Sequence, residues 1–288
     1  MKVFVAGSQG QLGLTLAETV PAAVDFAGAN LPELDITDLP ALKARLAAER
    51  PDFVVNAAAY TAVDKAESEP DVAQRVNADG ARNVAQAARE AGARVIHIST
   101  DFVFDGGKTE PYKPGDAPEP ASVYGQTKLD GETAVREATD GDAIVIRTAW
   151  LYSRFGQNFV KTMLRLMGER DTLSVVADQR GTPTWARSLA EVIWAVIDQD
   201  VPGGVYHWTD GGEASWFEFA GVIYTEARAS GLLDRDVEIR AISTAEYPTA
   251  ARRPAYSVLD CSATVAALAL EQRHWTSRLR QMLAEMEG

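Results

Sequence analysis

The chain has 288 residues, of which 46% are hydrophobic, and its formal net charge is -13 at pH 7. Apolar content of this size can fill one large core or two joined ones, whereas the negative charge opposes non-specific binding to nucleic acid or to anionic membranes. Because there is a single cysteine, three scattered histidines and no window near the ~20 apolar residues that cross a bilayer, we expect no disulfide, no zinc-type cluster and no membrane span.

The N-terminal residues are typical of a dinucleotide-binding unit. Residues 3–6 form a short apolar strand where a signal peptide would need a longer apolar run, so we expect a cytoplasmic protein. Gly7, Gly10 and Gly13 follow, and then an apolar-periodic helix through 14–20. The first glycine permits a tight turn, the second lets backbone N–H groups approach a pyrophosphate, and the third lets the helix pack closely on the strand. The alternative is a glycine-rich turn that binds nothing.

The end of the second strand leaves the cofactor preference open. An acidic residue there commonly selects NAD, and a basic one accommodates the extra phosphate of NADP. The strand at 24–28 ends in Gly-Ala-Asn, and no lysine or arginine occurs between Lys2 and Lys43. NADH and NADPH both remain candidates. Asp35 and Ile36 precede a helix at 42–49 and fit an adenine-side loop.

Small side chains follow the third strand. Residues 53–55 form a buried strand, and the run from Ala57 through Ala58 to Ala59 comes soon after it. Small residues at the carboxyl end of a strand allow a flat cofactor ring or a ribose to lie against the backbone, although close packing alone also uses alanine. A helix at 76–88 and a strand at 95–98 then lead to Ser99 and Thr100.

Tyr124 and Lys128 are four residues apart in a helix that opens near Ser122, so both side chains point into one cleft. A lysine cation beside a tyrosine favours the phenolate and lowers the pKa of the phenol from ~10. Thr100, at the end of the preceding strand, lies within reach of the same substrate oxygen. Between them, residues 106–120 are rich in glycine and proline, and we interpret them as a functional loop.

Together with the glycine loop, six further motifs resemble the extended short-chain dehydrogenase/reductase superfamily, and within it the dTDP-4-dehydrorhamnose reductase branch. The motifs are NAAAYTAVDKAE (56–67), STDFVFD (99–105), RTAW (147–150), NFV (158–160), DQRGTPTW (178–185) and RP (253–254). The resemblance implies an α/β fold with a Rossmann-type doubly wound parallel sheet. It further implies NADPH- or NADH-dependent reduction of the C4 ketone of dTDP-4-dehydro-L-rhamnose to dTDP-L-rhamnose, by a monomer or a homodimer.

The resemblance also implies roles for individual residues. Tyr124 would protonate the carbonyl oxygen as hydride arrives, Lys128 would lower the tyrosine pKa and hold the nicotinamide ribose, and Thr100 would orient the substrate. Asp101 and Trp150 match sugar-contact positions, although Trp150 suits an interface or core tryptophan equally well. The matching cofactor positions are Gly10, Gln11 and Leu12 for the pyrophosphate, Asp35 and Ile36 for the adenosine, and Ala59, Tyr60 and Thr61 for the nicotinamide side.

The sequence departs from the family pattern at two places. Phe102 stands where many relatives have tyrosine, and Thr15 stands where one subgroup has a magnesium-binding glutamate, although Glu191 is available in a later helix. We therefore predict no required metal. Five basic residues are candidates for a nucleotide diphosphate, because guanidinium forks match phosphate oxygens. They are Lys161, Arg180, Arg187, Arg252 and Arg253, of which we select Arg253.

Residues 149–288 show no clear linker. Helices are predicted at 159–167, 188–197 and 216–229, and strands at 173–176 and 205–208. We predict a dinucleotide-binding domain at 1–148, with return segments near 182–209. A smaller, discontinuous α/β substrate-binding lobe would then comprise mainly 149–181 and 210–288.

Three other functions are weighed against the reductase. Dehydration of the nucleotide sugar typically needs an Asp-Glu pair after the threonine, and Phe102 occupies the glutamate position. An epimerase, or a reductase of another nucleotide 4-keto-6-deoxysugar, stays open. A non-catalytic regulatory subunit, such as that of the animal methionine adenosyltransferase, resembles the same branch, and an intact Thr100, Tyr124 and Lys128 set favours catalysis over it.

Overall fold

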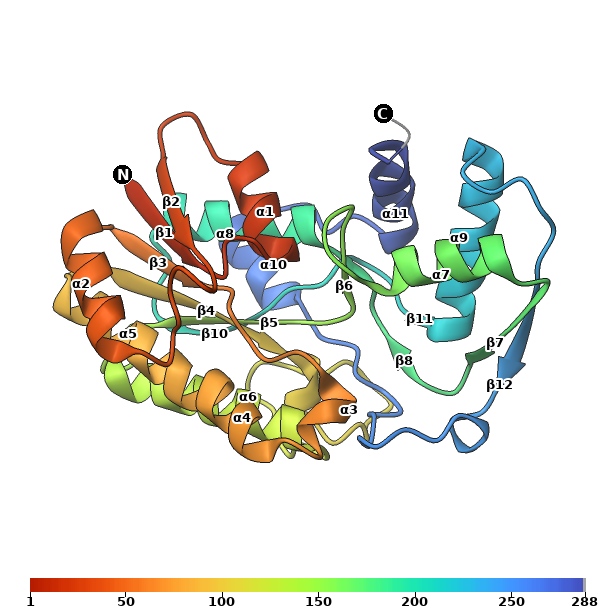
Figure 1. Ribbon diagram of the computed structural model, residues 1–288, viewed down its shortest axis with the longest axis horizontal. Coiled ribbons are helices and arrows are strands. Elements are labelled where there is room, and N and C mark those ends of the chain that lie inside the picture. The colour runs from red at the N-terminus through yellow and green to blue at the C-terminus, as the bar shows by residue number, and fades with distance from the viewer. Residues whose placement is uncertain (287–288) are drawn as a thin grey trace.

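The computed structural model describes residues 1–286, in which a six-stranded parallel sheet lies beside a smaller lobe (Figure 1). The strand order is β2, β1, β3, β4, β5, β10, and every neighbouring pair is parallel. The strands are β1 (Lys2–Ala6), β2 (Asp25–Ala29), β3 (Phe53–Asn56), β4 (Arg94–Thr100), β5 (Ile144–Thr148) and β10 (Gly204–His207). The predicted doubly wound α/β fold is confirmed.

Helices cover both faces of the sheet, which explains why its strands are apolar on both sides. Figure 1 shows α1, α8 and α10 over one face and α2, α5 and α6 over the other. Alternate residues of β1 serve the two cores: Val3 and Val5 pack with the first group, and Phe4 with the second. The helix bounds are α1 (Gln11–Glu18), α2 (Leu39–Glu49), α5 (Ala81–Glu90), α6 (Val123–Ala138), α8 (Ala186–Asp198) and α10 (Ser262–Leu268).

The topology places a crevice at the carboxyl ends of β1 and β3. The chain leaves β1 for β2 on one side and returns to β3 on the other, and ligands bind outside the sheet where the strand order reverses in this way. The two turns at this point are tied to the sheet. Gly7 N donates to Ala29 O at 2.9 Å, and Ala57 N donates to Ala6 O at 3.0 Å.

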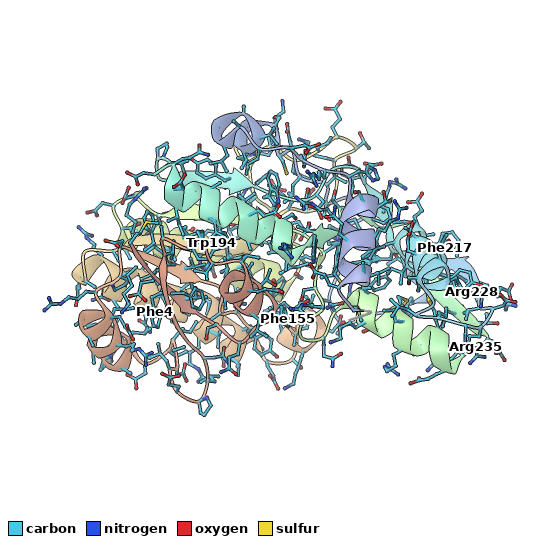
Figure 2. All side chains as sticks on the ribbon, turned by 90° about the horizontal axis from the view of Figure 1, so that it is seen from above. Phe4, Phe155, Trp194, Phe217, Arg228 and Arg235 are labelled. Atoms are coloured by element: carbon cyan, nitrogen blue, oxygen red, sulfur yellow. The ribbon has the colours of Figure 1, made fainter. Side chains whose placement is uncertain are left out.

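The smaller lobe has its own apolar cluster, in which Phe219, Trp275 and Met282 are buried. Figure 1 shows this lobe at the right, and Figure 2 shows Phe217, Arg228 and Arg235 at the opposite end of the molecule from Phe4. Its elements are α7 (Phe159–Glu169), α9 (Trp216–Ser230), α11 (Trp275–Ala284), the parallel pair β7 (Thr172–Val176) and β12 (Glu238–Ile242), and the short strands β6 (Leu151–Tyr152), β8 (Arg180–Gly181), β9 (Thr184–Trp185) and β11 (Ala214–Ser215).

The predicted domain bounds stay a prediction. α8 and β10 belong to the sheet unit, in the region of the return segment at 182–209, and α10 also packs against the sheet through Leu268. Residues 287 and 288 of the predicted lobe lie outside the described residues. The remaining elements are α3 (Val63–Ala66), α4 (Pro70–Gln74), the π-turn η1 (Arg75–Gly80) and the 3-10 turns η2 (Asp101–Val103) and η3 (Thr244–Glu246). Of the helices in residues 1–286, none combines the length and apolar character that crossing a membrane requires.

Candidate active site

A cavity of about 950 Å³ opens at the carboxyl ends of the sheet strands. It is lined from both the sheet unit and the smaller lobe, and we call it the site cavity. Apart from Tyr60, every residue that the sequence analysis assigns to a site lines it: Gly7, Gly10, Gln11, Leu12, Gly13, Asp35, Ile36, Ala58, Ala59, Thr61, Thr100, Asp101, Tyr124, Lys128, Trp150 and Arg253.

The glycine loop forms a cradle that other residues would fill. Gly7 has φ +85°, and a Cβ there would lie 2.7 Å from Ala58 N. A Cβ on Gly13 would lie 2.3 Å from Gly7 O. The loop therefore lies close to the backbone after β3, and it leads directly into α1, whose first N–H groups have no partner within the helix. Backbone N–H groups at such a place hold phosphate oxygens, so the cradle fits a dinucleotide.

Gln11 ties the start of α1 to the smaller lobe. Its Oε1 accepts hydrogen bonds from Asn158 Nδ2 at 2.9 Å and from Ser153 Oγ at 3.2 Å. Asn158 also caps α7, because its Oδ1 accepts from Lys161 N at 3.1 Å. The cofactor cradle and the first helix of the smaller lobe are thus connected by one side chain.

The adenine-side loop is rigidly held, and Tyr60 is not part of the cavity lining. Asp35 Oδ1 accepts from Thr37 N at 2.8 Å, and Asn83 Nδ2 donates to Ile36 O at 3.1 Å. Asn77 bonds both the backbone N–H and the backbone C=O of Tyr60. The Tyr60 hydroxyl donates to Glu69 Oε2 at 2.9 Å. The cofactor role of Tyr60 stays a prediction.

Tyr124 is positioned in the first turn of α6, where Ser122 Oγ accepts from Gly125 N at 3.2 Å and caps the helix. The tyrosine ring is 9% exposed and meets the Phe102 ring edge-on, with 5.5 Å between centroids. Burial raises the pKa of Tyr124 to about 12, against the lowering by a bond with Thr100. Besides burial and Thr100, only the Asp101 charge acts on this pKa, which it raises, so the lowering expected from Lys128 stays a prediction. A raised pKa keeps the phenol protonated, which is the form that can give a proton.

Lys128 lies one turn further along α6 and is 2% exposed. Its Nζ donates to Ile98 O at 2.7 Å. Burial lowers the pKa of Lys128 to about 8, and the charge of Glu132 opposes this lowering. The ammonium is thus fixed at the end of β4, on the same helix face as the phenol.

Two buried oxygens close to Thr100 are unpaired. Asp101 Oδ2 and Thr148 Oγ1 are buried and have no hydrogen-bond partner among the described residues, and both residues line the site cavity. The other Asp101 oxygen accepts from Thr100 Oγ1 at 3.0 Å. Burial raises the pKa of Asp101 to about 6. Such groups need a polar partner, and the site cavity is where a ligand hydroxyl or amide would supply one.

Arg253 reaches the site cavity but is engaged. Its guanidinium binds Asp64 through two hydrogen bonds of 3.0 and 2.7 Å, and Ala251 N donates to the same carboxylate at 3.1 Å. Of the five basic candidates, Arg253 is the one that lines the cavity in the described part of the chain. These hydrogen bonds to Asp64 connect the segment around Arg253 to α3.

The wall that the smaller lobe contributes contains a pair of stacked tryptophans. The rings of Trp150 and Trp216 are parallel, with 3.4 Å between centroids and 7° between planes. Trp150 has a positive φ of 47°, which bulky residues rarely adopt. Both line the cavity, although the sequence analysis singled out only Trp150. Gln157 and Arg75 also line the cavity. Neither could be predicted from the sequence, because a single residue in a loop or a helix carries no local pattern that marks it as part of a site.

No group of three or more histidine, cysteine or carboxylate side chains in residues 1–286 is arranged to hold a metal ion. Thr15 is buried and donates to Gln11 O at 2.7 Å, and Glu191 pairs with Arg278 at 2.6 Å. The absence of a required metal stays a prediction. No residue of the loop at 106–120 lines the site cavity, and Tyr112 pairs with Leu259, so a function of this loop stays a prediction.

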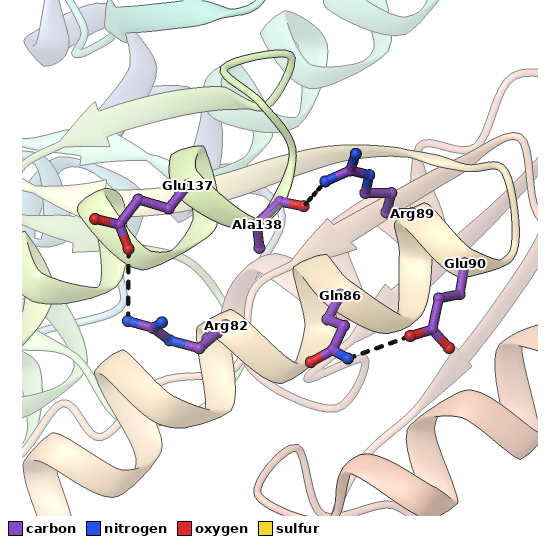
Figure 3. A pocket seen from close by; sticks show the side chains of 6 residues that line it. All are labelled: Arg82, Gln86, Arg89, Glu90, Glu137 and Ala138. Atoms are coloured by element: carbon purple, nitrogen blue, oxygen red, sulfur yellow. Dashed lines mark hydrogen bonds and ion pairs between the residues drawn. The ribbon is translucent and has the colours of Figure 1, made fainter.

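A separate hollow of about 590 Å³ lies on the outer surface of α5 and α6 (Figure 3). It shares no lining residue with the site cavity. Figure 3 shows its charged groups paired with their neighbours, for example Arg82 with Glu137 at 3.7 Å and Arg89 with Ala138 O at 3.1 Å. An open surface whose charges already pair with one another gives no sign of a ligand site.

Comparisons with known proteins agree with this geometry. Residues 1–287 match the family described as RmlD substrate binding domain. A dTDP-4-dehydrorhamnose reductase of Sinorhizobium fredii is 40% identical, over 98% of this chain and 97% of that protein. The crystal structure of a dTDP-4-dehydrorhamnose reductase from Clostridium acetobutylicum is 38% identical, with a TM-score of 0.94 over 100% of both chains. The enzyme from Bacillus anthracis, solved in complex with NADP, has a TM-score of 0.93 at 38% identity, over 99% of both chains.

Proposed function

The chain belongs to the RmlD substrate-binding family, and on that premise we propose that it is an NADPH- or NADH-dependent reductase. It reduces the C4 ketone of dTDP-4-dehydro-L-rhamnose and yields dTDP-L-rhamnose. The observation that carries the proposal is the convergence of Thr100, Tyr124 and Lys128 with the glycine cradle in one cavity. The similarity, over nearly the full length, to proteins known as dTDP-4-dehydrorhamnose reductases supports it.

Each residue of the site has its own role in the proposed reduction. The glycine cradle and Lys128 would hold a nicotinamide cofactor, which would supply a hydride for C4. Tyr124 gives its phenolic proton to the ketone oxygen, and its raised pKa keeps that proton available at neutral pH. Thr100 Oγ1 orients the same oxygen, and Lys128 supplies a nearby positive charge. The buried, unpaired oxygens of Asp101 and Thr148 belong to residues that line the cavity, which makes them candidates for contacts with the sugar.

Phe102 is evidence against dehydration of the nucleotide sugar. Phe102 presents an aromatic ring to Tyr124, at the place where elimination needs a carboxylate. An epimerase, a reductase of a related 4-keto-6-deoxysugar and a regulatory subunit remain the alternatives. Because the reaction uses small soluble metabolites, we also propose a cytoplasmic location. We further propose that the protein is a monomer or a homodimer, and analytical sedimentation would distinguish these two states.

One assay separates these functions. The protein is incubated with dTDP-4-dehydro-L-rhamnose and NADPH or NADH, the loss of reduced-cofactor absorbance is followed, and the product is identified by NMR. The proposal expects stoichiometric oxidation of the cofactor and dTDP-L-rhamnose. Isomerisation without net oxidation would indicate an epimerase, and no turnover with either cofactor would refute the reductase.

A further inference from the structure

The helix that carries Tyr124 and Lys128 also contributes to a buried ion pair, which has no role in the proposed reaction steps. Glu132 is one turn beyond Lys128 in α6, and Arg147 is in β5. Arg147 Nε donates to Glu132 Oε1 at 2.9 Å, and Nη2 donates to Oε2 at 2.7 Å. Both side chains are 4% exposed. A bidentate pair at this depth fixes both groups in place.

The carboxylate is held from a third direction by the strand that carries Thr100. Ser99 Oγ donates to Glu132 Oε1 at 2.5 Å, and Ser99 itself lines the site cavity. Arg147 is held in turn, because its guanidinium lies 5.1 Å from the Phe104 ring centroid and 3.5 Å from His207 Nε2. The position of the Glu132 carboxylate is thus determined from β4, β5 and β10.

The charges of this cluster do not cancel. Lys128 and Arg147 are both buried and basic, and Glu132 is a buried carboxylate that pairs with Arg147 and lies one turn from Lys128 in α6. Its charge is the neighbouring one that raises the pKa of Lys128 against the effect of burial. Among the described residues, Ile98 O is the hydrogen-bond acceptor of the Lys128 ammonium, so Glu132, one turn away on the same buried helix face, acts on it through charge and not through a hydrogen bond. An uncompensated buried cation is costly.

The other titratable groups near Lys128 do not replace this charge. Tyr124 is kept neutral by burial, and burial holds the pKa of His97 well below its ordinary value, so His97 is neutral too. The Asp101 carboxylate acts on Tyr124, whose pKa it raises. Arg147 is a cation already paired with Glu132.

We propose that Glu132 is a positioning residue of the reduction: its carboxylate, fixed by Arg147 and Ser99 one turn along α6 from Lys128, keeps the Lys128 ammonium charged beside Tyr124. The proposal rests on the proposed function, in which Lys128 must carry a charge. It assigns to the Glu132–Arg147 pair an electrostatic effect on the site in addition to its contribution to packing.

The test uses three variants of the full chain. Glu132→Gln removes the carboxylate, Arg147→Met removes its partner, and the double variant E132Q/R147M removes both, so that no unpaired charge remains buried and the chain can fold. The expected result is that the alkaline limb of the kcat/KM profile moves to lower pH by about one unit in E132Q and in the double variant. Arg147→Met keeps the carboxylate, so its limb does not move to lower pH.

A second readout needs no turnover and therefore separates this proposal from the reductase assignment. The titration of Lys128 Nζ is followed by NMR in lysine-labelled protein, with the signal assigned through Lys128→Arg. We expect a lower midpoint in the double variant than in the wild type. Glu191→Gln is the matched control, because it removes a carboxylate from Arg278 outside the site cavity and should leave the midpoint unchanged. A folded double variant with the wild-type midpoint and the wild-type limb would overturn the proposal.

Discussion

At the scale of single residues, the reaction depends on a phenol that burial keeps protonated. Tyr124 lines the site cavity, whereas Lys128 Nζ donates to Ile98 O near the end of β4. The two groups therefore have separate roles. Tyr124 donates the proton, and the positive charge of Lys128 stabilises the negative charge that develops as the proton is transferred. This division makes Tyr124 testable without disturbing the lysine.

We predict that Tyr124→Phe lowers kcat by at least about 10²-fold, the usual contribution of a general acid. The dissociation constant of the reduced cofactor should change less than about twofold, because the removed hydroxyl has no hydrogen bond that positions the glycine cradle. Stopped-flow kinetics and fluorescence titration measure the two quantities. Tyr206→Phe is the control, since the Tyr206 hydroxyl donates to Pro202 O at 2.8 Å and does not line the cavity. Retained activity in Tyr124→Phe would show that another group supplies the proton.

At the scale of elements, the segment around Arg253 acts as a fastening between the smaller lobe and α3. The Asp64 carboxylate binds both the Arg253 guanidinium and Ala251 N. Binding a substrate diphosphate would require the guanidinium to share or exchange this partner. The role predicted for Arg253 from the sequence therefore depends on a competition that only the folded chain reveals.

Two variants distinguish a diphosphate contact from a purely structural fastening. Arg253→Ala should raise the KM of the nucleotide sugar about tenfold and change kcat little, because uniform binding energy is lost. Asp64→Asn frees the guanidinium, so the KM should stay the same or fall. Steady-state kinetics with saturating cofactor provide both values. If the two variants raise KM equally, Arg253 has no direct contact with the diphosphate.

The elements show what the sequence could predict. Strands β1, β3 and β4 are short apolar runs that end in small or polar residues, so both their existence and the edge that carries the site were predictable. α11 was missed, although Trp275, Leu279 and Met282 recur at helical spacing and all are buried. Trp216 could not be found, because its stacking on Trp150 joins residues from α9 and the sheet edge, and no local pattern records that contact.

The Glu132–Arg147 pair illustrates the same limit in electrostatics. Their spacing in sequence carries no signal, because the pair is created by the packing of α6 against β5. The effect of burial on the pKa of Tyr124 was likewise not predictable from the sequence, since burial is a property of the fold. Chemistry that depends on residue type was predictable, and chemistry that depends on environment was not.

At the scale of the whole molecule, buried histidine and aspartate side chains have opposite effects on how the stability of the fold depends on pH. Burial lowers the pKa of His207 to about 3, whereas burial raises the pKa of Asp101 to about 6 and that of Asp210 to about 7. On acidification the unfolded chain takes up the histidine proton first, which destabilises the fold below about pH 6.5. The two aspartates bind protons first in the folded chain, which stabilises it as the pH falls from about 7 towards 4. Between about pH 4 and 7 the two aspartates therefore oppose the effect of His207.

Removing His207 should expose the aspartate contribution. His207 is buried between Arg147 and Tyr112 O, so the folded chain keeps the ring neutral. At pH 5 the unfolded ring is protonated, and its preference for the unfolded state is ~2 kcal/mol. We predict that the unfolding free energy of His207→Gln, relative to the wild type, improves by about 2 kcal/mol between pH 7.5 and pH 5. Urea denaturation at both pH values measures this difference, and the exposed His274 provides the control variant His274→Gln. A difference that is the same at both pH values would mean that His207 takes up its proton equally well in the folded chain.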